Sequence, residues 1–161
     1  MSETTTVAQF LTFSLGDEVF ALDVAKVREV LEMIPPTRLP HAPDYMSGVV
    51  NVRGSVVPVI DLRLKLGMGA AERTVNTCII VIEVPLEQGM TVLGVLVDSV
   101  QEVVEFDARQ ISPAPRIGTG VQVDFLTGIG KRDEKFVLIM DIGRVLSEQD
   151  VRMIEEAESG N

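Results

Sequence analysis

The sequence predicts a mainly β fold in which two small β units share one aliphatic core. Short apolar runs rich in Val, Ile and Leu are separated by turns that contain Gly, Pro and Asp, as in residues 48–62. Hydrophobic residues make up 46% of the chain and aromatic residues only 4%, so the expected core is large and aliphatic. With 161 residues, the chain has room for one domain or for two small subdomains that pack together.

The chain also aligns with itself in two places without gaps. Residues 24–32 match residues 97–105 at five of nine positions, and residues 48–66 match residues 128–146 at a constant offset of 80. We therefore expect residues 9–150 to form a single duplicated domain, whose halves, 9–75 and 76–146, each form a barrel or curled sheet of about five strands. Neither half can bury much surface alone, so the two should share their core.

The first half contains two predicted hairpins. Residues 9–15 and 18–22 are apolar runs around a Gly-Asp turn, and residues 48–52 and 55–62 flank a second turn at Asn51–Gly54. Between them, Val27, Val30 and Leu31 have the spacing of a helix face, but so short a run also suits a strand, and both readings stay open. The prolines of residues 35–43 indicate an extended connector.

The second half repeats this order of elements. Strands are expected at 77–84, 90–97, 126–129 and 135–140, whereas 107–124 reads mostly as loop. Short helices should follow Asp61 and Asp141, which occupy equivalent positions and are good helix caps. Ser147 and Asp150 resemble a capping box that begins an amphipathic C-terminal helix, so residues 147–161 are expected to form a helix and a tail.

The composition predicts a cytoplasmic protein with no enzymatic site. The formal charge of −10 argues against nucleic acid and anionic membranes as partners. His41 is the only histidine, and the sequence has no Cys/His cluster and no Gly-rich phosphate loop, so no cofactor or metal is expected. No signal peptide or membrane-spanning run is visible, and insertion into a membrane is not expected.

One enzymatic alternative is a metal-dependent hydrolase. Asp61, Asp98 and Asp141 each follow an apolar strand, an arrangement that carboxylate metal sites use. Because Asp61 and Asp141 are equivalent in the two repeats, helix capping explains them more simply. Arg53, by contrast, is not needed by the strand pair, because the second repeat carries Asp133 at its turn. The chain thus has a boundary between its two repeats, which we call the seam, and a distinctive turn at Arg53, which we call the tip, but it has no recognisable catalytic groups. This combination indicates a docking scaffold.

Five motifs that follow one another in order resemble the CheW family of bacterial chemotaxis coupling proteins. They are Phe13-Ser-Leu-Gly-Asp-Glu-Val-Phe-Ala-Leu-Asp-Val24, Gly48-Val-Val-Asn-Val-Arg-Gly54, Val57-Pro-Val-Ile-Asp-Leu62, Gly94-Val-Leu-Val-Asp98 and Leu126-Thr-Gly-Ile-Gly130. The resemblance implies two SH3-like β-barrel subdomains around a hydrophobic core. It also implies a non-enzymatic adaptor, recruited to membrane receptor arrays, that joins chemoreceptors to the regulatory domain of the histidine kinase CheA.

The resemblance further implies three contact sites. The helical hairpin of the receptor would bind in a groove between the subdomains, formed by Val24, Val27, Glu29, Val30, Gly94, Val100 and Val103. Receptor and kinase coupling would use the tip formed by Asn51, Arg53 and Gly54. A second, ring-forming kinase contact would involve Ser112, Arg116 and Ile117, where the family has a basic residue, an acid and an aromatic instead. The same adaptor role in a non-flagellar pathway, for pilus motility or development, is the alternative.

Overall fold

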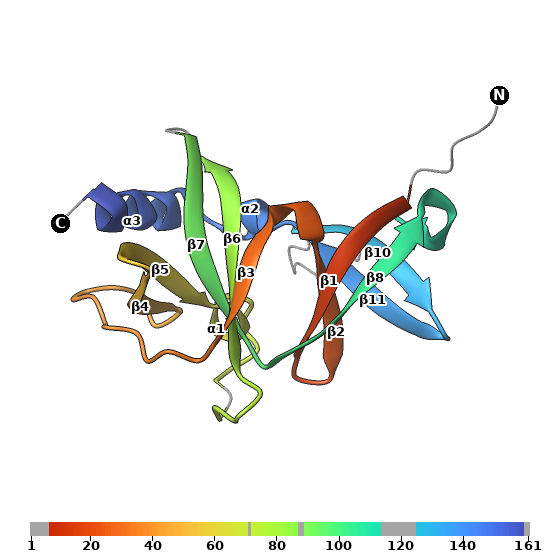
Figure 1. The fold of residues 1–161 in the computed structure, drawn as a ribbon, viewed down its shortest axis with the longest axis horizontal. Coiled ribbons are helices and arrows are strands. Elements are labelled where there is room, and N and C mark those ends of the chain that lie inside the picture. Colours follow the sequence, from red (N-terminus) through yellow and green to blue (C-terminus); the bar gives the residue numbers. More distant parts are fainter. Residues whose placement is uncertain (1–6, 71, 87–88, 114–124, 160–161) are drawn as a thin grey trace.

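In the computed structural model, residues 7–70, 72–86, 89–113 and 125–159 are described, and they form two mixed β-sheets that lie side by side (Figure 1). Short helices follow some of the strands, and the C-terminal helix lies along one sheet. The mainly β fold predicted from the apolar runs is confirmed. None of the helices in these ranges is long and apolar enough to cross a membrane.

The first sheet has six strands in the order β8-β1-β2-β11-β10-β9. All neighbours are antiparallel except β2 and β11, which run parallel. The bounds of its strands are Val7–Leu15 for β1, Glu18–Asp23 for β2, Ser99–Asp107 for β8, Ile111–Ser112 for β9, Leu126–Arg132 for β10 and Lys135–Met140 for β11.

The second sheet has five strands in the order β3-β6-β7-β5-β4. Here β5 and β7 form the parallel pair, so the pattern of the first sheet is repeated. The bounds are Val27–Glu32 for β3, Met46–Val52 for β4, Ser55–Asp61 for β5, Cys78–Leu86 for β6 and Gly89–Val97 for β7. Residues 27–32 are thus a strand, which resolves the choice between strand and helix.

The two sheets do not correspond to the two halves of the sequence, and the predicted division at residues 75 and 76 is wrong. Strands from residues 27–97 form the second sheet, whereas the first sheet joins residues 7–23 to residues 99–140. Each repeat therefore donates its first hairpin to the sheet of the other repeat. Self-alignment cannot reveal this exchange, because it shows which segments are alike but not which segments pair.

One large apolar cluster joins the two sheets, as predicted for a shared core. It contains Phe13 and Leu15 from the first sheet and Ile80, Ile82 and Leu93 from the second, each at most 1% exposed. A smaller cluster lies within each sheet, around Phe106 in the first and around Ile79 in the second. The joint between the sheets is therefore built from buried apolar side chains of both sheets.

The helices begin where the sequence places cap residues. The Asp61 carboxylate accepts a hydrogen bond from Leu64 N (3.2 Å) at the start of α1 (Leu62–Lys65), and that of Asp141 accepts one from Gly143 N (2.9 Å) at the start of α2 (Ile142–Val145). Two 3-10 helices, η1 (Val24–Lys26) and η2 (Ala108–Gln110), follow β2 and β8. These caps explain why both aspartates recur in the repeats.

The C-terminal helix α3 (Glu148–Ser159) is held by a buried carboxylate. Ser147 and Asp150 bond reciprocally, as the capping box predicts, with distances of 3.0 and 3.1 Å. Asp150 is fully buried and also contacts Lys65 Nζ and the Tyr45 hydroxyl, both at 2.6 Å. Because Tyr45 precedes β4 and Lys65 belongs to α1, this network fastens α3 to the second sheet.

Candidate functional site

The strands β3 and β8 each form one edge of a sheet, and the repeated valines lie on them. Val27 pairs with Ile82 and Val30 with Ile80. Cross-strand partners point to the same face of a sheet, and both isoleucines belong to the cluster that joins the sheets. The side chains of Val27 and Val30 therefore point toward the seam.

The second repeat has the same arrangement on β8. Val100 pairs with Phe13 and Val103 with Leu11, and both partners again belong to the central cluster. In β3 and in β8 the register shifts between the two valines, so each strand carries one extra residue there. This β-bulge places residues three apart on one face, which explains why a strand carries the valine spacing of a helix.

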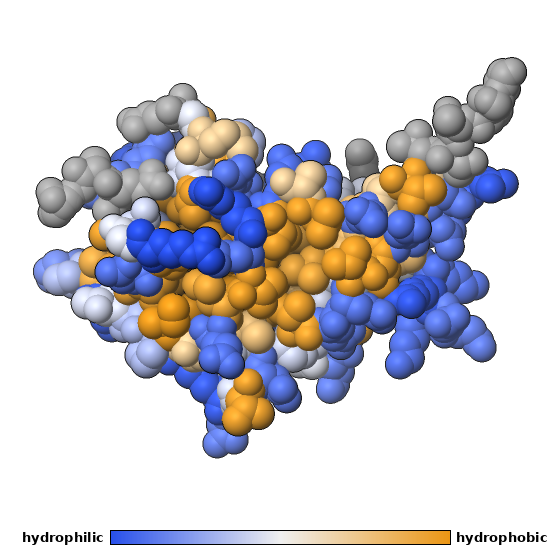
Figure 2. All heavy atoms as spheres, viewed as in Figure 1, coloured by the Kyte–Doolittle hydropathy of each residue, from blue (hydrophilic) through white to orange (hydrophobic). Residues whose placement is uncertain are grey.

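We call Val24, Val27, Val30, Val100 and Val103 the valine surface. Val24, Val27 and Val100 are half-buried and pack on the central cluster, whereas Val30 is 41% exposed and Val103 is 50% exposed. The surface is thus anchored in the core at one end and open to solvent at the other. Figure 2 shows apolar area across the middle of the molecule, over the region where β3 and β1 lie in Figure 1.

Gly94 does not belong to this surface. It is buried in the middle of β7, between Val81 and Val59 on the neighbouring strands. A Cβ atom there would come within 2.8 Å of Ile79, in the cluster inside the second sheet. The expected grouping of Gly94 with the valines is therefore wrong, because alternate residues of β7 face opposite sides.

The turn between β4 and β5 carries an exposed ion pair. Arg53 Nη2 lies 3.1 Å from Glu29 Oε1 on β3, and the Arg53 side chain is 81% exposed. Arg53 and Gly54 have φ values of 52° and 89°, as a tight two-residue hairpin turn requires. The Asn51 side chain accepts a hydrogen bond from Gly54 N (2.8 Å) and stabilises this turn. The structure thus brings together the three predicted tip residues and Glu29.

The other sheet carries an equivalent tip, which the sequence comparison missed. Arg132 Nη1 lies 3.0 Å from Glu102 Oε2, and Glu102 is the repeat equivalent of Glu29. The arginine precedes the turn instead of lying in it, because Asp133 takes the left-handed position with a φ of 50°. The ungapped alignment therefore places Arg53 opposite Asp133 and misses Arg132. The match of Glu29 with Glu102 was the one sequence signal that pointed to a second ion pair.

Each tip lies beside a shallow hollow with an exposed apolar side chain. The hollow at Arg53 has a volume of about 260 Å³ and includes Val56, which is 52% exposed. The hollow at Arg132 has a volume of about 300 Å³ and includes Phe136, which is 63% exposed. The two ends of the molecule are thus similar in build but differ in the size of the apolar side chain.

The predicted second kinase contact is described only in part. Ser112 lies in β9, where it is exposed and pairs with Ile129. Arg116 and Ile117 fall outside the described residues.

The aspartates of the alternative metal site have separate structural tasks. Asp61 and Asp141 cap helices, and Asp98 accepts hydrogen bonds from Gly16 N (2.7 Å) and from Arg63 (2.9 Å). Burial raises the pKa of Asp61, although the backbone N–H groups of Leu64 and Arg63 partly offset it. Within the described ranges, no three His, Cys, Asp or Glu side chains are grouped as a metal site requires.

Comparison with known proteins identifies the family. The family of the CheW-like domain matches residues 9–150. The chain is 36% identical to chemotaxis protein CheW of Klebsiella aerogenes, over 91% of this chain and 86% of that protein. It is 34% identical to the probable chemotaxis protein CheW of Rhizobium etli, over 88% of this chain and 89% of that one.

A solved structure has the same fold. The scaffolding protein TtCheW from Thermoanaerobacter tengcongensis superimposes with a TM-score of 0.80 at 31% identity, covering 90% of this chain and 96% of that one. On the sequence, the fold and this coverage together, the chain belongs to the family of the CheW-like domain, and its solved relative is named a scaffolding protein.

Proposed function

We propose that this chain is the adaptor that couples chemoreceptors to the histidine kinase CheA in bacterial chemotaxis. The observation that carries the proposal is the valine surface, where two bulged edge strands present paired valines beside the core. Relatives that carry the name CheW are chemotaxis proteins, which gives this surface its biological context. The chain would act in the cytoplasm at receptor arrays and bind its partners without chemical change.

The receptor would contact the valine surface through its cytoplasmic helical hairpin. A helix offers a stripe of apolar side chains, and the bulges in β3 and β8 place Val27 and Val30, and Val100 and Val103, on one face of their strands. Val30 and Val103 supply exposed apolar area, while the half-buried valines hold the strands in place. This is helix-in-groove recognition, in which buried aliphatic contacts provide most of the affinity.

The kinase would contact the tip at Arg53. Its regulatory domain is expected to have the same fold, so one barrel end can pair with another. The exposed guanidinium of Arg53 and the exposed side chain of Val56 offer a charged and an apolar contact side by side. Glu29 extends from the valine-bearing strand to Arg53, so the ion pair connects the proposed receptor and kinase sites.

Co-sedimentation with receptor-containing membranes tests the proposal. Wild-type protein should sediment with the membranes and raise CheA activity, and Arg53→Glu should sediment but fail to raise it. The matched control Arg132→Glu, which reverses the equivalent charge at the other tip, should retain more activity than Arg53→Glu. Absence of recruitment with every receptor preparation, in the presence and absence of CheA, would disprove the coupling role.

A further inference from the structure

Asp98 joins the two sheets at a point where the chain crosses from one to the other. It is the single residue between β7, in the second sheet, and β8, in the first. Its backbone N–H donates to the carbonyl oxygen of Ser14 on β1 (3.1 Å). Its carboxylate Oδ2 accepts hydrogen bonds from Gly16 N (2.7 Å), in the turn between β1 and β2, and from Arg63 Nη1 (2.9 Å) in α1. Since α1 packs against the second sheet, one oxygen atom connects both sheets.

Arg63 is held in place for this contact. Its Nε donates to the carbonyl oxygen of Gly69 (3.1 Å), so one nitrogen binds the loop after α1 and another binds Asp98. The Arg63 and Asp98 side chains are 18% and 29% exposed, which shelters most of the ion pair from water. A Cβ atom on Gly16 would lie 3.2 Å from Arg63 Nη1, so the guanidinium also packs against the turn. Charge-assisted hydrogen bonds of this kind are strong and directional.

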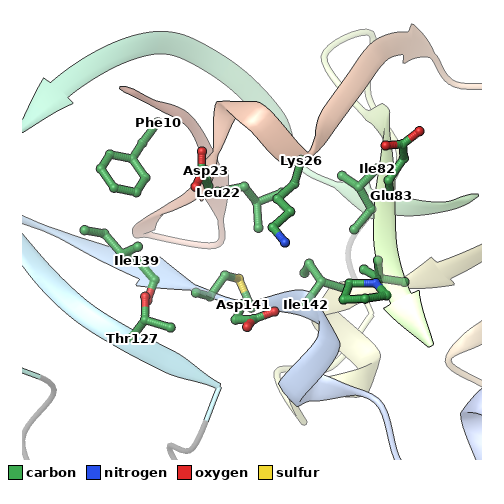
Figure 3. A pocket seen from close by; sticks show the side chains of 13 residues that line it. Phe10, Leu22, Asp23, Lys26, Ile82, Glu83, Thr127, Ile139, Asp141 and Ile142 are labelled. Atoms are coloured by element: carbon green, nitrogen blue, oxygen red, sulfur yellow. The ribbon is translucent and has the colours of Figure 1, made fainter. Parts of the chain in front are cut away.

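The joint between the sheets is less completely filled away from Asp98. A pocket with a volume of about 180 Å³ lies between the sheets there, with Leu22 of β2 on one side and Ile82 of β6 on the other (Figure 3). Along β6, Cys78 pairs with Val97, the neighbour of Asp98, and the pocket is reached only at Ile82. Because side chains that line an unfilled space lack partners on one side, packing at the pocket constrains the sheets less than the hydrogen bonds at Asp98 do.

The angle between the sheets matters to the valine surface, because that surface belongs to both of them. Val27 and Val30 lie on β3, at the edge of the second sheet. Val100 and Val103 lie on β8, at the edge of the first, and β8 begins directly after Asp98. The apolar contacts between the sheets have no preferred direction, whereas hydrogen bonds weaken steeply when they are misaligned. The contacts of Asp98 therefore set the relative position of the two pairs of valines.

We propose that Asp98, held by Arg63, is a positioning residue for receptor binding, which fixes the angle between the sheets and so the separation of the two pairs of valines. The inference rests on the function proposed above, in which one helical hairpin contacts both pairs at once. A site that is already rigid in the free protein loses less conformational entropy when the partner binds. Asp98 acts through β8 and needs no contact of its own with the receptor.

Residual dipolar couplings of the backbone amides test this role without any receptor, because they report how two rigid bodies are oriented. In the wild type, one alignment tensor should fit the couplings of both sheets. In Asp98→Ala, the couplings of each sheet should still fit that sheet alone, but the joint fit should become worse. A loss of stability by itself would not change the joint fit. If one tensor still fits both sheets in their wild-type orientation, the inference is overturned.

Two further variants keep the test decisive. Arg63→Met removes the other partner of the ion pair and should have the same effect, so a result is obtained even if Asp98→Ala does not fold. Asp98→Asn should preserve the wild-type orientation better than Asp98→Ala, because its amide oxygen accepts the hydrogen bonds that Oδ2 accepts. Equal disturbance by the asparagine and alanine variants would refute a role for these hydrogen bonds.

Asp107→Ala is the matched control. Asp107 ends β8, its side chain is 23% exposed, and its carboxylate accepts a hydrogen bond from Arg109 N (2.8 Å), as a cap that lies within one sheet. This variant should leave the joint fit unchanged. A disturbance as large as that in Asp98→Ala would show that the loss of any sheltered carboxylate near β8 alters the orientation, which would contradict the inference.

Co-sedimentation with receptor membranes connects the angle to binding. Asp98→Ala should bind about threefold to tenfold more weakly than the wild type, as expected for a residue that acts without touching the ligand, and Asp107→Ala should bind equally well. A changed orientation with wild-type affinity would refute the positioning role. Failure of the wild type to sediment would instead disprove the proposed coupling function, and the dipolar couplings would still decide whether Asp98 sets the angle.

Discussion

Arg132 lies 3.0 Å from Glu102, and the pair repeats in the second repeat the contact that Arg53 makes with Glu29 at 3.1 Å in the first. The carboxylates are equivalent in the sequence, but the arginines are displaced by one position. The ion pair has thus been kept at both ends of the molecule although the turn residues differ. Such a pair offers a matched internal control for every experiment on the first tip.

Arg53→Glu should preserve the fold and abolish kinase stimulation. The second repeat shows that an acid is accepted at this turn position, because Asp133 adopts a φ of 50° there. The Arg53 side chain is exposed, so the free energy of unfolding should change by less than about 1 kcal/mol. Urea denaturation and a receptor-coupled kinase assay measure the two effects. Stimulation at the wild-type level would show that the tip has no coupling role.

Val30→Asp and Val103→Asp should weaken receptor binding roughly tenfold or more, equivalent to about 1.4 kcal/mol or more. Both side chains are about half-exposed and can be charged without opening the core. Val27→Asp and Val100→Asp should also weaken binding, but at a larger cost in stability because these residues pack on the central cluster. Sedimentation with receptor membranes measures the binding.

Met90→Asp provides the control for this valine series. Met90 is 60% exposed and lies on β7, away from the two edge strands. This variant should bind receptor membranes as the wild type does. If it loses as much binding as Val30→Asp, the valine surface is not the receptor site and added charge alone explains the loss.

Asp150→Ala should lower the free energy of unfolding by about 3–5 kcal/mol, because it leaves the Lys65 ammonium buried without its partner. Burial alone would raise the pKa of Asp150, but hydrogen bonds from Lys65, Ser147 N and Tyr45 lower it overall. Its contribution is therefore present above the pKa of the unfolded chain and is lost as the pH falls through the folded value. Urea denaturation measures the change in the free energy of unfolding, and Asp133→Ala, at an exposed position, is the control. An equal loss of stability in the two variants would contradict the role of the buried network.

Tyr45 should lose its proton only at an unusually high pH, and its ionisation should report on the same network of Asp150, Lys65 and Tyr45. Burial and then the hydrogen bond to Asp150 raise its pKa from 10.0 to about 12. A raised pKa stabilises the fold below pH 10, and this contribution is lost as the pH rises through 12. The chain has one Tyr and no Trp, so ultraviolet absorbance of tyrosinate follows this residue alone. A midpoint near 10 in the folded protein would show that the hydroxyl is not held by Asp150.

Asp61→Asn should leave the protein as stable as the wild type, or more stable, at neutral pH. Burial raises the pKa of Asp61, so wild-type stability from this group falls as the pH rises through the folded value. Asparagine still caps α1 and carries no charge. Comparing unfolding at acidic and neutral pH reveals the difference. A loss of stability on addition of a chelator to the wild type would instead support the metal-site alternative.

The elements predicted correctly are those whose signals are local. The Gly-Asp turn after Leu15, the caps at Asp61 and Asp141 and the Ser147 capping box each depend on residues a few positions apart, and each is present. Periodicity left residues 27–32 open between helix and strand, because the bulge in β3 gives a strand the spacing of a helix.

The features that could not be predicted from the sequence depend on strand pairing between segments that lie far apart in the chain. The parallel pairing of β2 with β11 and of β5 with β7 places each hairpin in the other repeat's sheet. No local pattern encodes such a choice, because both hairpins are rich in apolar residues. Gly94 was misplaced for the same reason: which face of β7 meets the seam depends on its neighbours in the sheet.

The exchange of hairpins also determines the order in which the strands can pair while the chain is being synthesised. The second sheet contains only residues 27–97, so all its strands are available before the first sheet can be completed. The β1–β2 hairpin leaves the ribosome first but must wait for β8 and β11, its neighbours on either side. Domains generally fold as units during synthesis, and exposed strand edges favour aggregation. The nascent chain thus carries an apolar hairpin with two unpaired edges until β8 and β11 have been made, and aggregation through these edges is favoured in that interval.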